Sequence, residues 1–249
     1  MNVLILAAGY ATRLYPLTLN KAKPLLEIAG KPMIEWIVDH LGSGPGLGTI
    51  YVVTNDKFAS DFQAWASGYT KRKPGVKFKV ISDGSTSDSD KLGAIGDIHL
   101  VLARENLTTD DLLVVAGDNL FSESLGGFVE YAKGKPATVA VYDVGSLETI
   151  TKYGCVTIDE NGVVTHFEEK PPKPTSTLAA IALYYYSREV LSLFATYLAA
   201  GNNPDQPGRF LQWLYPRKPV HTFQMKGLWL DIGSKETLEE ANKIFRQFI

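Results

Sequence analysis

The first segment with residue types suited to phosphate chemistry is the turn at residues 6–14, which reads LAAGYATRL. Its small residues let backbone N–H groups approach an anion closely, and the Arg13 guanidinium offers a fork of phosphate donors. The turn matches neither GxxxxGK[ST] nor GxGxxG. It therefore predicts an unconventional phosphate cradle, with the candidate residues Leu6, Ala8, Gly9, Tyr10, Ala11 and Thr12. The alternative is a tight strand-to-helix turn that binds no ligand.

Lys23 and two aspartates extend this chemistry. Lys21 and Lys23 precede an apolar stretch, where a lysine ammonium can pair with phosphate; the alternative is two solvated lysines. Asp118 follows the apolar run at 112–116, and Asp231 lies in an LWLDIG run, so apolar residues flank each carboxylate. Two aspartates that converge on Mg²⁺, together with substrate phosphates, would offset the cost of such surroundings. The alternative is two separately capped turn aspartates.

The FEEKP run at residues 167–171 could hold an acceptor molecule. Glu169 and Lys170 combine a carboxylate for hydroxyl groups with an ammonium for a phosphate. The alternative is an edge strand protected by charges. The histidines are scattered and show the spacing of neither metal ligands nor a Ser/His/Asp triad, which disfavours structural zinc and triad hydrolysis. They are His40, His99, His166 and His221.

Composition narrows the class of protein. The 249 residues include 25 Lys and Arg, 27 Asp and Glu and 45% hydrophobic residues, as in a folded globular protein. Balanced charge without long like-charged runs disfavours a nucleic-acid or membrane partner and favours a small molecule. The apolar runs are too short to span a membrane, and no secretion signal is recognisable. Because the lone Cys155 has no internal disulfide partner, we expect a cytoplasmic protein and an inert thiol.

Strands and helices that alternate along the first half of the chain would position these residues. The predicted elements are strands over 2–6, 49–53, 76–80 and 112–116 and helices over 33–41 and 95–103. Residues 42–48, GSGPGLG, follow a helix and predict a linker. Ligands of parallel sheets bind beyond the carboxyl ends of the strands, where the cradle and Asp118 fall.

The second half of the chain has a different pattern, which predicts antiparallel strands. Residues 155–158 and 163–167 flank Asn161-Gly162, a pair that supplies the positive φ of a tight hairpin turn. Further predictions are strands over 179–186 and 219–223, a helix over 189–198 and a closing helix behind Ser234 with Leu238, Ala241, Ile244, Phe245 and Phe248 on one face. The predicted fold class is α/β, with a Rossmann-like, mostly parallel sheet sandwiched by helices and a small antiparallel β insertion.

Together these motifs resemble the sugar-phosphate nucleotidyltransferase family, which contains glucose-1-phosphate thymidylyl- and uridylyltransferases. The family's opening signature, L-A-x-G-x-G-T-R-x-x-P followed by P-K-P, is largely matched by residues 6–16 and 22–24. Its G-D-N, Y-G-V, E-E-K-P and W-x-D-x-G blocks resemble Gly117-Asp118-Asn119, Tyr153-Gly154-Cys155, residues 168–171 and residues 229–233. The motifs are in order and cover nearly the whole chain, which makes the resemblance specific.

The resemblance implies the nucleotide-diphospho-sugar transferase fold and a single nucleotidyltransferase domain over residues 1–249. Within that domain, residues 1–145 would mainly bind the NTP, residues 146–233 would mainly bind the sugar phosphate, and residues 234–249 would form the closing helix. The implied cofactor is Mg²⁺.

The resemblance also implies roles for single residues. Arg13 and Lys23 would hold the triphosphate and act in catalysis. Asp118, also catalytic, would bind Mg²⁺ together with Asp231. The residues that would bind the sugar phosphate are Asn119, Gly154, Glu169 and Lys170.

Two departures from the family pattern stand out. Ala11 replaces the usual Gly, and if that position needs positive φ, the alanine costs about 1 kcal/mol. The base-reading segment, usually a Gln followed by P-x-G-L/T-A-x-A, is replaced by Asp83-Gly84, a polar loop and KLGA at 91–94. Asp83, Gly93 and Ala94 are the nucleotide-binding candidates there, and the loop at 83–90 is either functional or a solvated, mobile loop.

The resulting prediction is an enzyme that transfers a nucleotidyl group from an NTP to a sugar 1-phosphate, giving an NDP-sugar and pyrophosphate. One alternative is a cytidylyltransferase that acts on a phosphorylated alcohol such as phosphocholine. Another is a non-catalytic regulatory module that binds nucleotide sugars. The sequence leaves open the base, the sugar, the pathway and association into a homo-oligomer.

Overall fold

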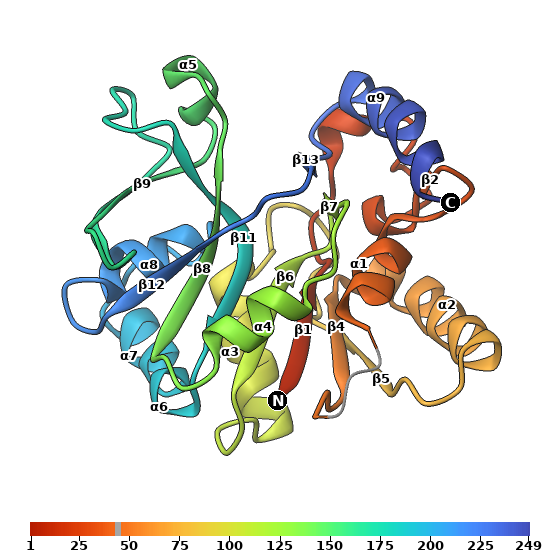
Figure 1. The fold of residues 1–249 in the computed structure, drawn as a ribbon. Coiled ribbons are helices and arrows are strands. Elements are labelled where there is room, and N and C mark those ends of the chain that lie inside the picture. Colours follow the sequence, from red (N-terminus) through yellow and green to blue (C-terminus); the bar gives the residue numbers. More distant parts are fainter. Residues whose placement is uncertain (43–45) are drawn as a thin grey trace. The chain divides into compact units, whose positions relative to one another are not determined.

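The computed structural model of the chain describes residues 1–42 and 46–249, which form two compact units (Figure 1). The terminal unit comprises Met1–Lys91, Val115–Gly126 and Gly227–Ile249. The middle unit comprises Leu92–Val114 and Gly127–Lys226. Residues 43–45 of the predicted linker lie outside the described residues.

The terminal unit is built on three parallel strands in the order β1, β4, β5 (Figure 1). These strands are β1 (Asn2–Leu6), β4 (Ile50–Thr54) and β5 (Phe78–Ser82), and the helices are α1 (Met33–Leu41), α2 (Ala59–Arg72) and α9 (Lys235–Phe245). Short 3-10 turns cover η1 (Thr12–Leu14), η2 (Lys23–Leu25), η3 (Asp56–Phe58) and η4 (Arg246–Phe248). The predicted strand–helix–strand order is confirmed, although β5 begins two residues later than the alternation at 76–80 indicated.

Apolar periodicity explains why these segments form these elements. Val3, Leu4 and Ile5 of β1 are fully buried, as expected of a strand covered on both faces. Helix α1 buries residues at helical spacing, namely Ile34, Ile37, Val38 and Leu41. It ends at Gly42, whose φ of 69° is a conformation that glycine adopts without steric cost.

Two small antiparallel sheets complete the terminal unit. One pairs β2 (Glu27–Ile28) with β3 (Lys31–Pro32), and the other pairs β7 (Asn119–Phe121) with β13 (Trp229–Asp231). The second sheet joins segments more than a hundred residues apart in sequence, and the sequence did not predict it.

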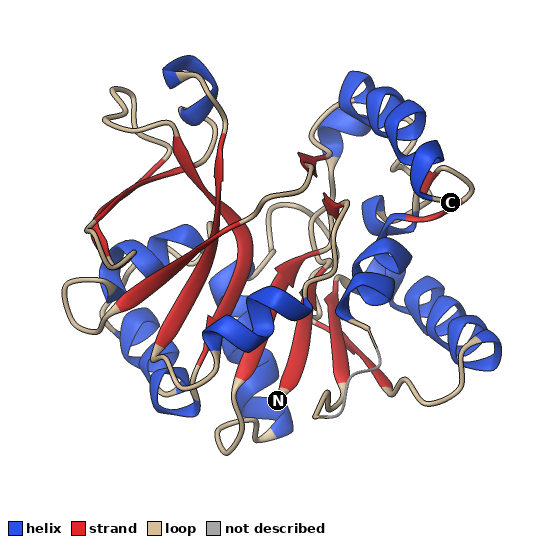
Figure 2. Ribbon diagram, in the orientation of Figure 1, coloured by secondary structure: helices blue, strands red, loops and turns tan. Residues whose placement is uncertain are grey.

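The middle unit carries mixed strands in the order β10, β9, β11, β8, β12, with helices beside them (Figure 2). The strands are β8 (Ala137–Asp143), β9 (Gly154–Ile158), β10 (Val164–Glu169), β11 (Leu178–Tyr186) and β12 (Val220–Gln224). The helices are α3 (Ala94–Glu105), α4 (Gly126–Ala132), α5 (Leu147–Ile150), α6 (Arg188–Leu191), α7 (Leu193–Ala199) and α8 (Gly208–Leu214). Strand β6 (Leu112–Ala116) gives its first residues to this unit and its last two to the terminal unit.

The antiparallel insertion forms as predicted, but its turn and a later helix differ from the predictions. Strands β9 and β10 pair as a hairpin, but only Gly162 of the Asn161-Gly162 pair has positive φ, at 72°. The predicted helix over 189–198 is two helices, α6 and α7, which separate at Ser192. Cys155 is buried in β9 and donates a hydrogen bond to Ser176 O.

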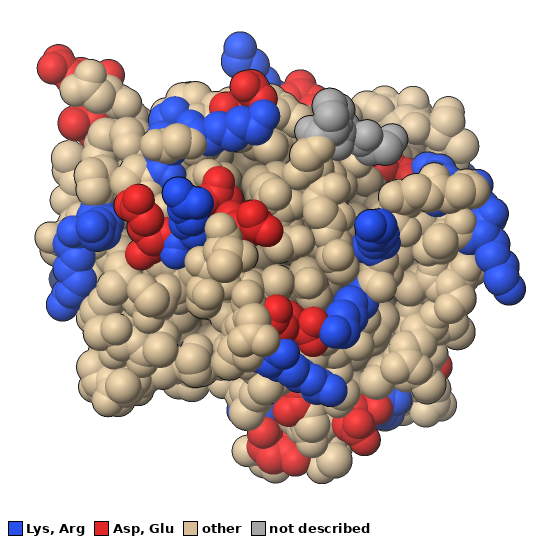
Figure 3. All heavy atoms as spheres, turned by 90° about the horizontal axis from the view of Figure 1, so that it is seen from below, with Lys and Arg blue, Asp and Glu red and all other residues tan. Residues whose placement is uncertain are grey.

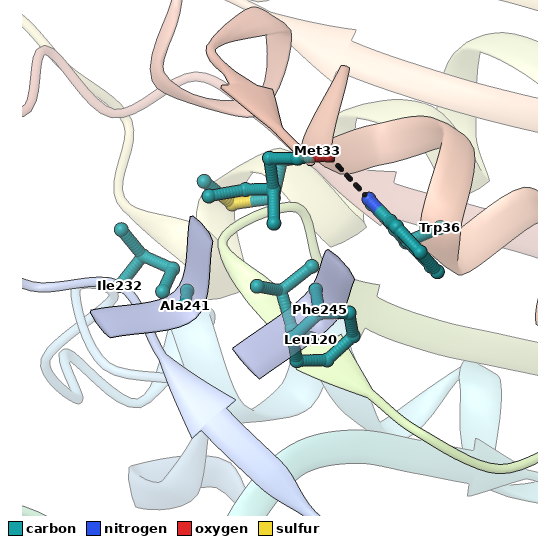
Figure 4. Close-up of a cluster of buried hydrophobic side chains, with 7 residues drawn as sticks. Met33, Trp36, Leu120, Ile232, Ala241 and Phe245 are labelled. Atoms are coloured by element: carbon teal, nitrogen blue, oxygen red, sulfur yellow. Dashed lines mark hydrogen bonds between the residues drawn. The ribbon is translucent and has the colours of Figure 1, made fainter. Parts of the chain in front are cut away.

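One apolar cluster ties together the three sequence segments of the terminal unit (Figure 4). Its buried members are Ile28, Met33, Trp36, Leu120, Ile232, Ala241 and Phe245. Phe245 packs edge-to-face on Trp36, with ring centroids 5.0 Å apart. Helix α9 thus forms as predicted behind a capping box at Ser234, but Phe248 lies in η4 and is 41% exposed rather than part of the buried face.

We expect Phe245→Ala to lower the free energy of unfolding by about 3–5 kcal/mol, because it leaves a cavity beside Trp36 in a fully buried cluster. Urea denaturation measures this change. Ile249→Ala is the control, because Ile249 is 84% exposed, and its effect should stay within about 0.5 kcal/mol. Equal effects of the two substitutions would show that the cluster does not hold the three segments together.

The charge distribution on the surface and the length and polarity of the helices are relevant to nucleic-acid and membrane partners. On the face drawn in Figure 3, basic and acidic side chains lie interspersed among uncharged residues. In the part of the chain that the structure describes, every helix is too short or too polar to cross a bilayer.

Candidate active site

The turn after β1 has the strained backbone expected of a tight cradle. Ala11 adopts a left-handed conformation, with φ 49° and ψ 44°, and this costs a residue with a Cβ about 1–2 kcal/mol. Thr18 Oγ1 donates to Ala11 O at 2.8 Å, and Asn55 Nδ2 donates to Ala8 O at 3.0 Å. Position 11 therefore does have positive φ, and side-chain hydrogen bonds to Ala11 O and Ala8 O hold the turn in place.

Several donors of this turn are open to a ligand. The backbone N–H groups of Gly9, Tyr10 and Ala11 have no acceptor within the described residues. The Arg13 side chain is exposed and has no hydrogen-bond or ion-pair partner among residues 1–42 and 46–249. Leu6 O accepts from Gly117 N at 2.9 Å, so the cradle adjoins the segment that carries Asp118. This arrangement is what anion binding by backbone amides requires.

Lys23 and Asp118 form a short ion pair. Lys23 Nζ lies 2.7 Å from Asp118 Oδ2, and their side chains are 13% and 31% exposed. The interpretation of Lys23 as a solvated surface lysine is therefore wrong. Gly117 allows the two segments to meet, because a Cβ at this position would lie 2.9 Å from Pro24 Cγ and 3.0 Å from Leu6 O.

The β7–β13 pair brings Asp231, the last residue of β13, beside the turn that carries Asp118 just before β7. Asp231 lies opposite Asn119 in the antiparallel register, and Ile232 N donates to Asp118 O at 3.1 Å. Asp118 and Asp231 are far apart in sequence, but the residues beside them, Leu120 and Ile232, pack in the same apolar cluster, which holds the two segments together. The convergence of the two segments is thus a property of the fold.

A chain of hydrogen bonds orients the Asp118 carboxylate. Trp229 Nε1 donates to Asn119 Oδ1 at 2.5 Å, and Asn119 Nδ2 donates to Asp118 Oδ1 at 3.0 Å. Lys23 holds the other carboxylate oxygen. Each oxygen of Asp118 therefore has a fixed donor, which is the type of support that holds a functional side chain in one geometry.

The charges around Asp118 keep its carboxyl group ionised. Burial acts to raise the pKa of Asp118, but the Lys23 ammonium and the Asn119 amide outweigh burial and hold the pKa below its ordinary value. The carboxylate is therefore negative at neutral pH, as a metal ligand must be.

The oxygen donors present fit Mg²⁺ better than a structural metal. Among residues 1–42 and 46–249, no group of three or more His, Cys, Asp or Glu side chains is placed to hold a metal ion. Mg²⁺ commonly takes one or two carboxylates and completes its octahedral shell with water and substrate phosphates. If both bind metal, Asp118 and Asp231 would supply two hard carboxylate donors, which suits this mode of binding and not a closed zinc site.

The Asp83 side chain forms hydrogen bonds within its own loop. Its carboxylate accepts from Ser85 N at 2.7 Å and from Ser85 Oγ at 2.8 Å. The Ser85 hydroxyl also lies 3.4 Å from Tyr10 OH, so this loop contacts the cradle. Asp83 is thus near the predicted nucleotide site, while its role in reading a base stays a prediction.

The rest of this polar loop is closed by Asp90. The carboxylate accepts from the backbone N–H groups of Thr86 and Ser87 and from their hydroxyls. The Thr86 N–H first, and then the Ser87 N–H, lower the pKa of Asp90 to about 2. These local hydrogen bonds explain why the loop contains serine and threonine residues.

Gly93 and Ala94 lie in the middle unit at the start of α3. Ala94 N donates to Asp205 O at 3.1 Å, and Ile95 N donates to Pro204 O at 2.8 Å. A Cβ on Gly93, whose φ is 79°, would lie 2.7 Å from Pro204 O. The first amides of α3 thus already have acceptors, so the predicted contact of Gly93 and Ala94 with a nucleotide has to use other atoms.

The three acceptor-site candidates of the middle unit lie together. Gly154 faces Glu169 in the β9–β10 register, and Lys170 N donates to Tyr153 O at 3.0 Å. Lys170 ends the strand in a left-handed conformation, with φ 49°. The Glu169 side chain is partly buried and the Lys170 side chain is exposed.

The Glu169 carboxylate carries an electrostatic cost. Burial raises the pKa of Glu169, and the nearby Lys170 and Arg209 charges only partly oppose this rise. Within the described chain no group donates a hydrogen bond to this carboxylate. Its oxygens are therefore available to accept hydrogen bonds from a ligand.

Sequence reasoning missed three supporting residues: Thr18, Asn55 and Trp229. Asn55 is fully buried and directly follows β4, so the rule that located Asp118 also indicates it. Trp229 was part of a recognised motif, but its contact with Asn119 depends on strand pairing. No spacing in the sequence indicates the bond from Thr18 to the cradle.

Comparisons with known proteins find related chains. A family model described as nucleotidyl transferase matches residues 2–247. The bifunctional protein GlmU of Methanocaldococcus jannaschii is 27% identical over 243 residues, which cover 98% of this chain and 54% of that protein. The glucose-1-phosphate adenylyltransferase of Bacillus subtilis is 27% identical over 254 residues, which cover 96% of this chain and 65% of that protein. The chain thus spans between about half and about two thirds of the length of these relatives.

A solved structure shows the same fold. A UDP-glucose pyrophosphorylase complexed with UDP-glucose matches with a TM-score of 0.82 at 24% sequence identity, covering 99% of this chain and 98% of that one. The predicted α/β class, with a mostly parallel sheet, flanking helices and an antiparallel insertion, is confirmed.

Proposed function

The chain belongs to the nucleotidyl transferase family, and from this membership and the Asp118 network we propose that it transfers a nucleotidyl group from an NTP to a sugar 1-phosphate. The products are an NDP-sugar and pyrophosphate. Support for a sugar 1-phosphate acceptor comes from the relative named as a glucose-1-phosphate adenylyltransferase.

The observation that carries the proposal is the oriented pair of Lys23 and Asp118. A cation 2.7 Å from a carboxylate that Asn119 also fixes is a preorganised arrangement, and such arrangements stabilise charge that shifts during phosphoryl chemistry. The open amides of Gly9, Tyr10 and Ala11 and the free guanidinium of Arg13 lie on the adjoining cradle. A purely structural turn does not need these unused donors.

In the proposed reaction, a phosphate oxygen of the sugar 1-phosphate attacks the α-phosphorus of the NTP. The new P–O bond forms as the bond to the bridging oxygen of the β-phosphate breaks, and pyrophosphate leaves. Arg13 and Lys23 bind the phosphates and neutralise the charge that develops on the leaving group. No protein nucleophile is needed, because the acceptor phosphate is already anionic.

Asp118 and Asp231 would hold Mg²⁺. The bound ion would supply further neutralisation of the phosphate oxygens, worth several kcal/mol in such reactions. Trp229 and Asn119 keep the Asp118 carboxylate in the orientation that this role needs.

Glu169 and Lys170 would bind the acceptor. The unpartnered Glu169 carboxylate accepts hydrogen bonds from sugar hydroxyls, and the exposed Lys170 ammonium pairs with the phosphate. In this proposal Gly154, opposite Glu169, lines the same part of the site. Asn119 is already bonded to Asp118 and Trp229, so its contribution is to position Asp118.

The proposal is tested by pyrophosphate release with Mg²⁺ across dTTP, UTP, CTP, GTP and ATP, each against a panel of sugar 1-phosphates. We expect one productive pair, which identifies the base and the sugar together. Absence of pyrophosphate release with every combination of NTP and sugar 1-phosphate would contradict the proposal. Turnover of CTP with phosphocholine, or nucleotide-sugar binding without turnover, would then favour the cytidylyltransferase or the regulatory module.

A further inference from the structure

The Glu169 carboxylate lies directly against a glycine of α8. A Cβ built on Gly208 would be 1.9 Å from Glu169 Oε2 and 3.0 Å from its Cδ. On the other side, a Cβ on Gly154 would be 3.2 Å from the same oxygen. The carboxylate therefore occupies a slot between two glycines, beside the Phe167 ring, whose Cζ would be 3.2 Å from the Cβ on Gly208. The carboxylate has room there because Gly208 lacks a side chain.

Backbone conformation does not require glycine at position 208. Gly208 is not among the described glycines with positive φ, and it is the first residue of α8. A glycine there loses more conformational freedom on folding than an alanine would. The conformational cost of this glycine is thus offset by the space that it leaves for the carboxylate.

Helix α8 also holds the backbone of Glu169. Glu169 N donates to Gln212 Oε1 at 3.2 Å, one turn after Gly208. The same helix therefore fixes both the main chain and the side chain of Glu169. This second contact is independent of the glycine slot and defines where the carboxylate can point.

Charge next to the slot favours an ionised carboxylate without covering it. Arg209 follows Gly208, and its Nε donates to Gln206 Oε1 at 2.5 Å rather than to Glu169. Arg209 and Lys170 act on Glu169 through space, and no described residue donates a hydrogen bond to its oxygens. Both oxygens remain available for a ligand.

We propose that Gly208 is a positioning residue that sets the acceptor specificity of this chain by opening the slot in which Glu169 presents its carboxylate to adjacent hydroxyl groups of a sugar. The inference rests on the proposed function, because it gives the acceptor of that reaction its recognition element. Gly208 does not touch substrate; it acts through Glu169.

The test is a double-mutant cycle on the acceptor KM. Gly208→Ala should displace the flexible end of Glu169 and raise the acceptor KM roughly ten- to hundredfold, as expected for lost hydrogen bonds to a charged group, with the NTP KM unchanged. In a Glu169→Ala background the same substitution should change the acceptor KM less than about twofold, because the group that it displaces is gone. Gly127→Ala in α4 is the matched control, since its Cβ would meet only the Phe223 ring at 3.7 Å.

An unchanged acceptor KM in Gly208→Ala, or an equal rise in the Glu169→Ala background, would overturn the inference. If the wild type releases no pyrophosphate with any acceptor, the proposed function fails and the acceptor role of Gly208 fails with it, while the carboxyl ¹³C titration of Glu169 still decides whether Gly208 positions the carboxylate. We expect Gly208→Ala to move the raised pKa of Glu169 toward its ordinary value as the carboxylate leaves the slot. An identical titration in the two proteins would overturn it.

Discussion

Replacing Asp118 with alanine should slow nucleotidyl transfer by at least about 10³-fold while the protein stays folded. The substitution removes an ionised carboxylate that Lys23 and Asn119 hold in place and that the proposed mechanism assigns to Mg²⁺. A metal ligand contributes several kcal/mol to neutralising the phosphates, and each 1.4 kcal/mol corresponds to about tenfold in rate.

The measurement is initial-rate pyrophosphate release with the productive substrate pair, with circular dichroism to verify the fold. Asp61→Ala is the control, because Asp61 is an exposed carboxylate on α2. Its activity should match the wild type. Near-wild-type turnover of Asp118→Ala would remove Asp118 from the proposed metal site.

Lys23→Ala should lower kcat by about 10²-fold or more, the usual effect of removing one preorganised electrostatic donor. The Lys23 side chain is only 13% exposed and its Nζ lies 2.7 Å from Asp118 Oδ2, so its charge acts in a partly desolvated site. Because this interaction strengthens as charge develops on the leaving pyrophosphate, the loss should fall on kcat more than on the KM for NTP.

Lys21→Ala provides a closely matched control for this prediction. Lys21 has the same charge, lies two residues away and is exposed. Steady-state kinetics of both variants should separate them by the full 10²-fold. If kcat is unchanged in Lys23→Ala, the ion pair with Asp118 is structural and the proposed role for Lys23 is wrong.

Periodicity made much of the fold predictable. Strand β1, helix α1 and strand β11 each carry apolar residues at the spacing of their element, and each forms within a residue or two of the predicted bounds. The N-cap at Ser234 correctly marked the start of α9. These signals are local, so one sequence is enough to show them.

The elements that were missed carry weaker or non-local signals. Helix α2 buries Phe62, Ala66 and Tyr69 at helical spacing, but its many polar residues and Gly68 obscure the pattern. Strands β7 and β13 are three residues each, too short to show a period. They exist because they pair with each other, which no local pattern reveals.

Some residues of the candidate site can likewise be predicted from local sequence signals, and others cannot. Residues that follow apolar runs, such as Asp118, can be found from the sequence because strand ends are marked by composition. The partner of Asp118 could not be found this way, since Lys23 lies 95 residues away in sequence. Gly208 carries no signal either, because its importance depends on the distance to Glu169.

The most direct test of the proposed nucleotidyl transfer is to quantify both products of one productive NTP and sugar 1-phosphate pair in the presence of Mg²⁺. Transfer yields NDP-sugar and pyrophosphate in equal amounts from the start of the reaction, and neither product when the sugar 1-phosphate is omitted. Pyrophosphate without NDP-sugar would show hydrolysis of the NTP and would overturn the proposed function.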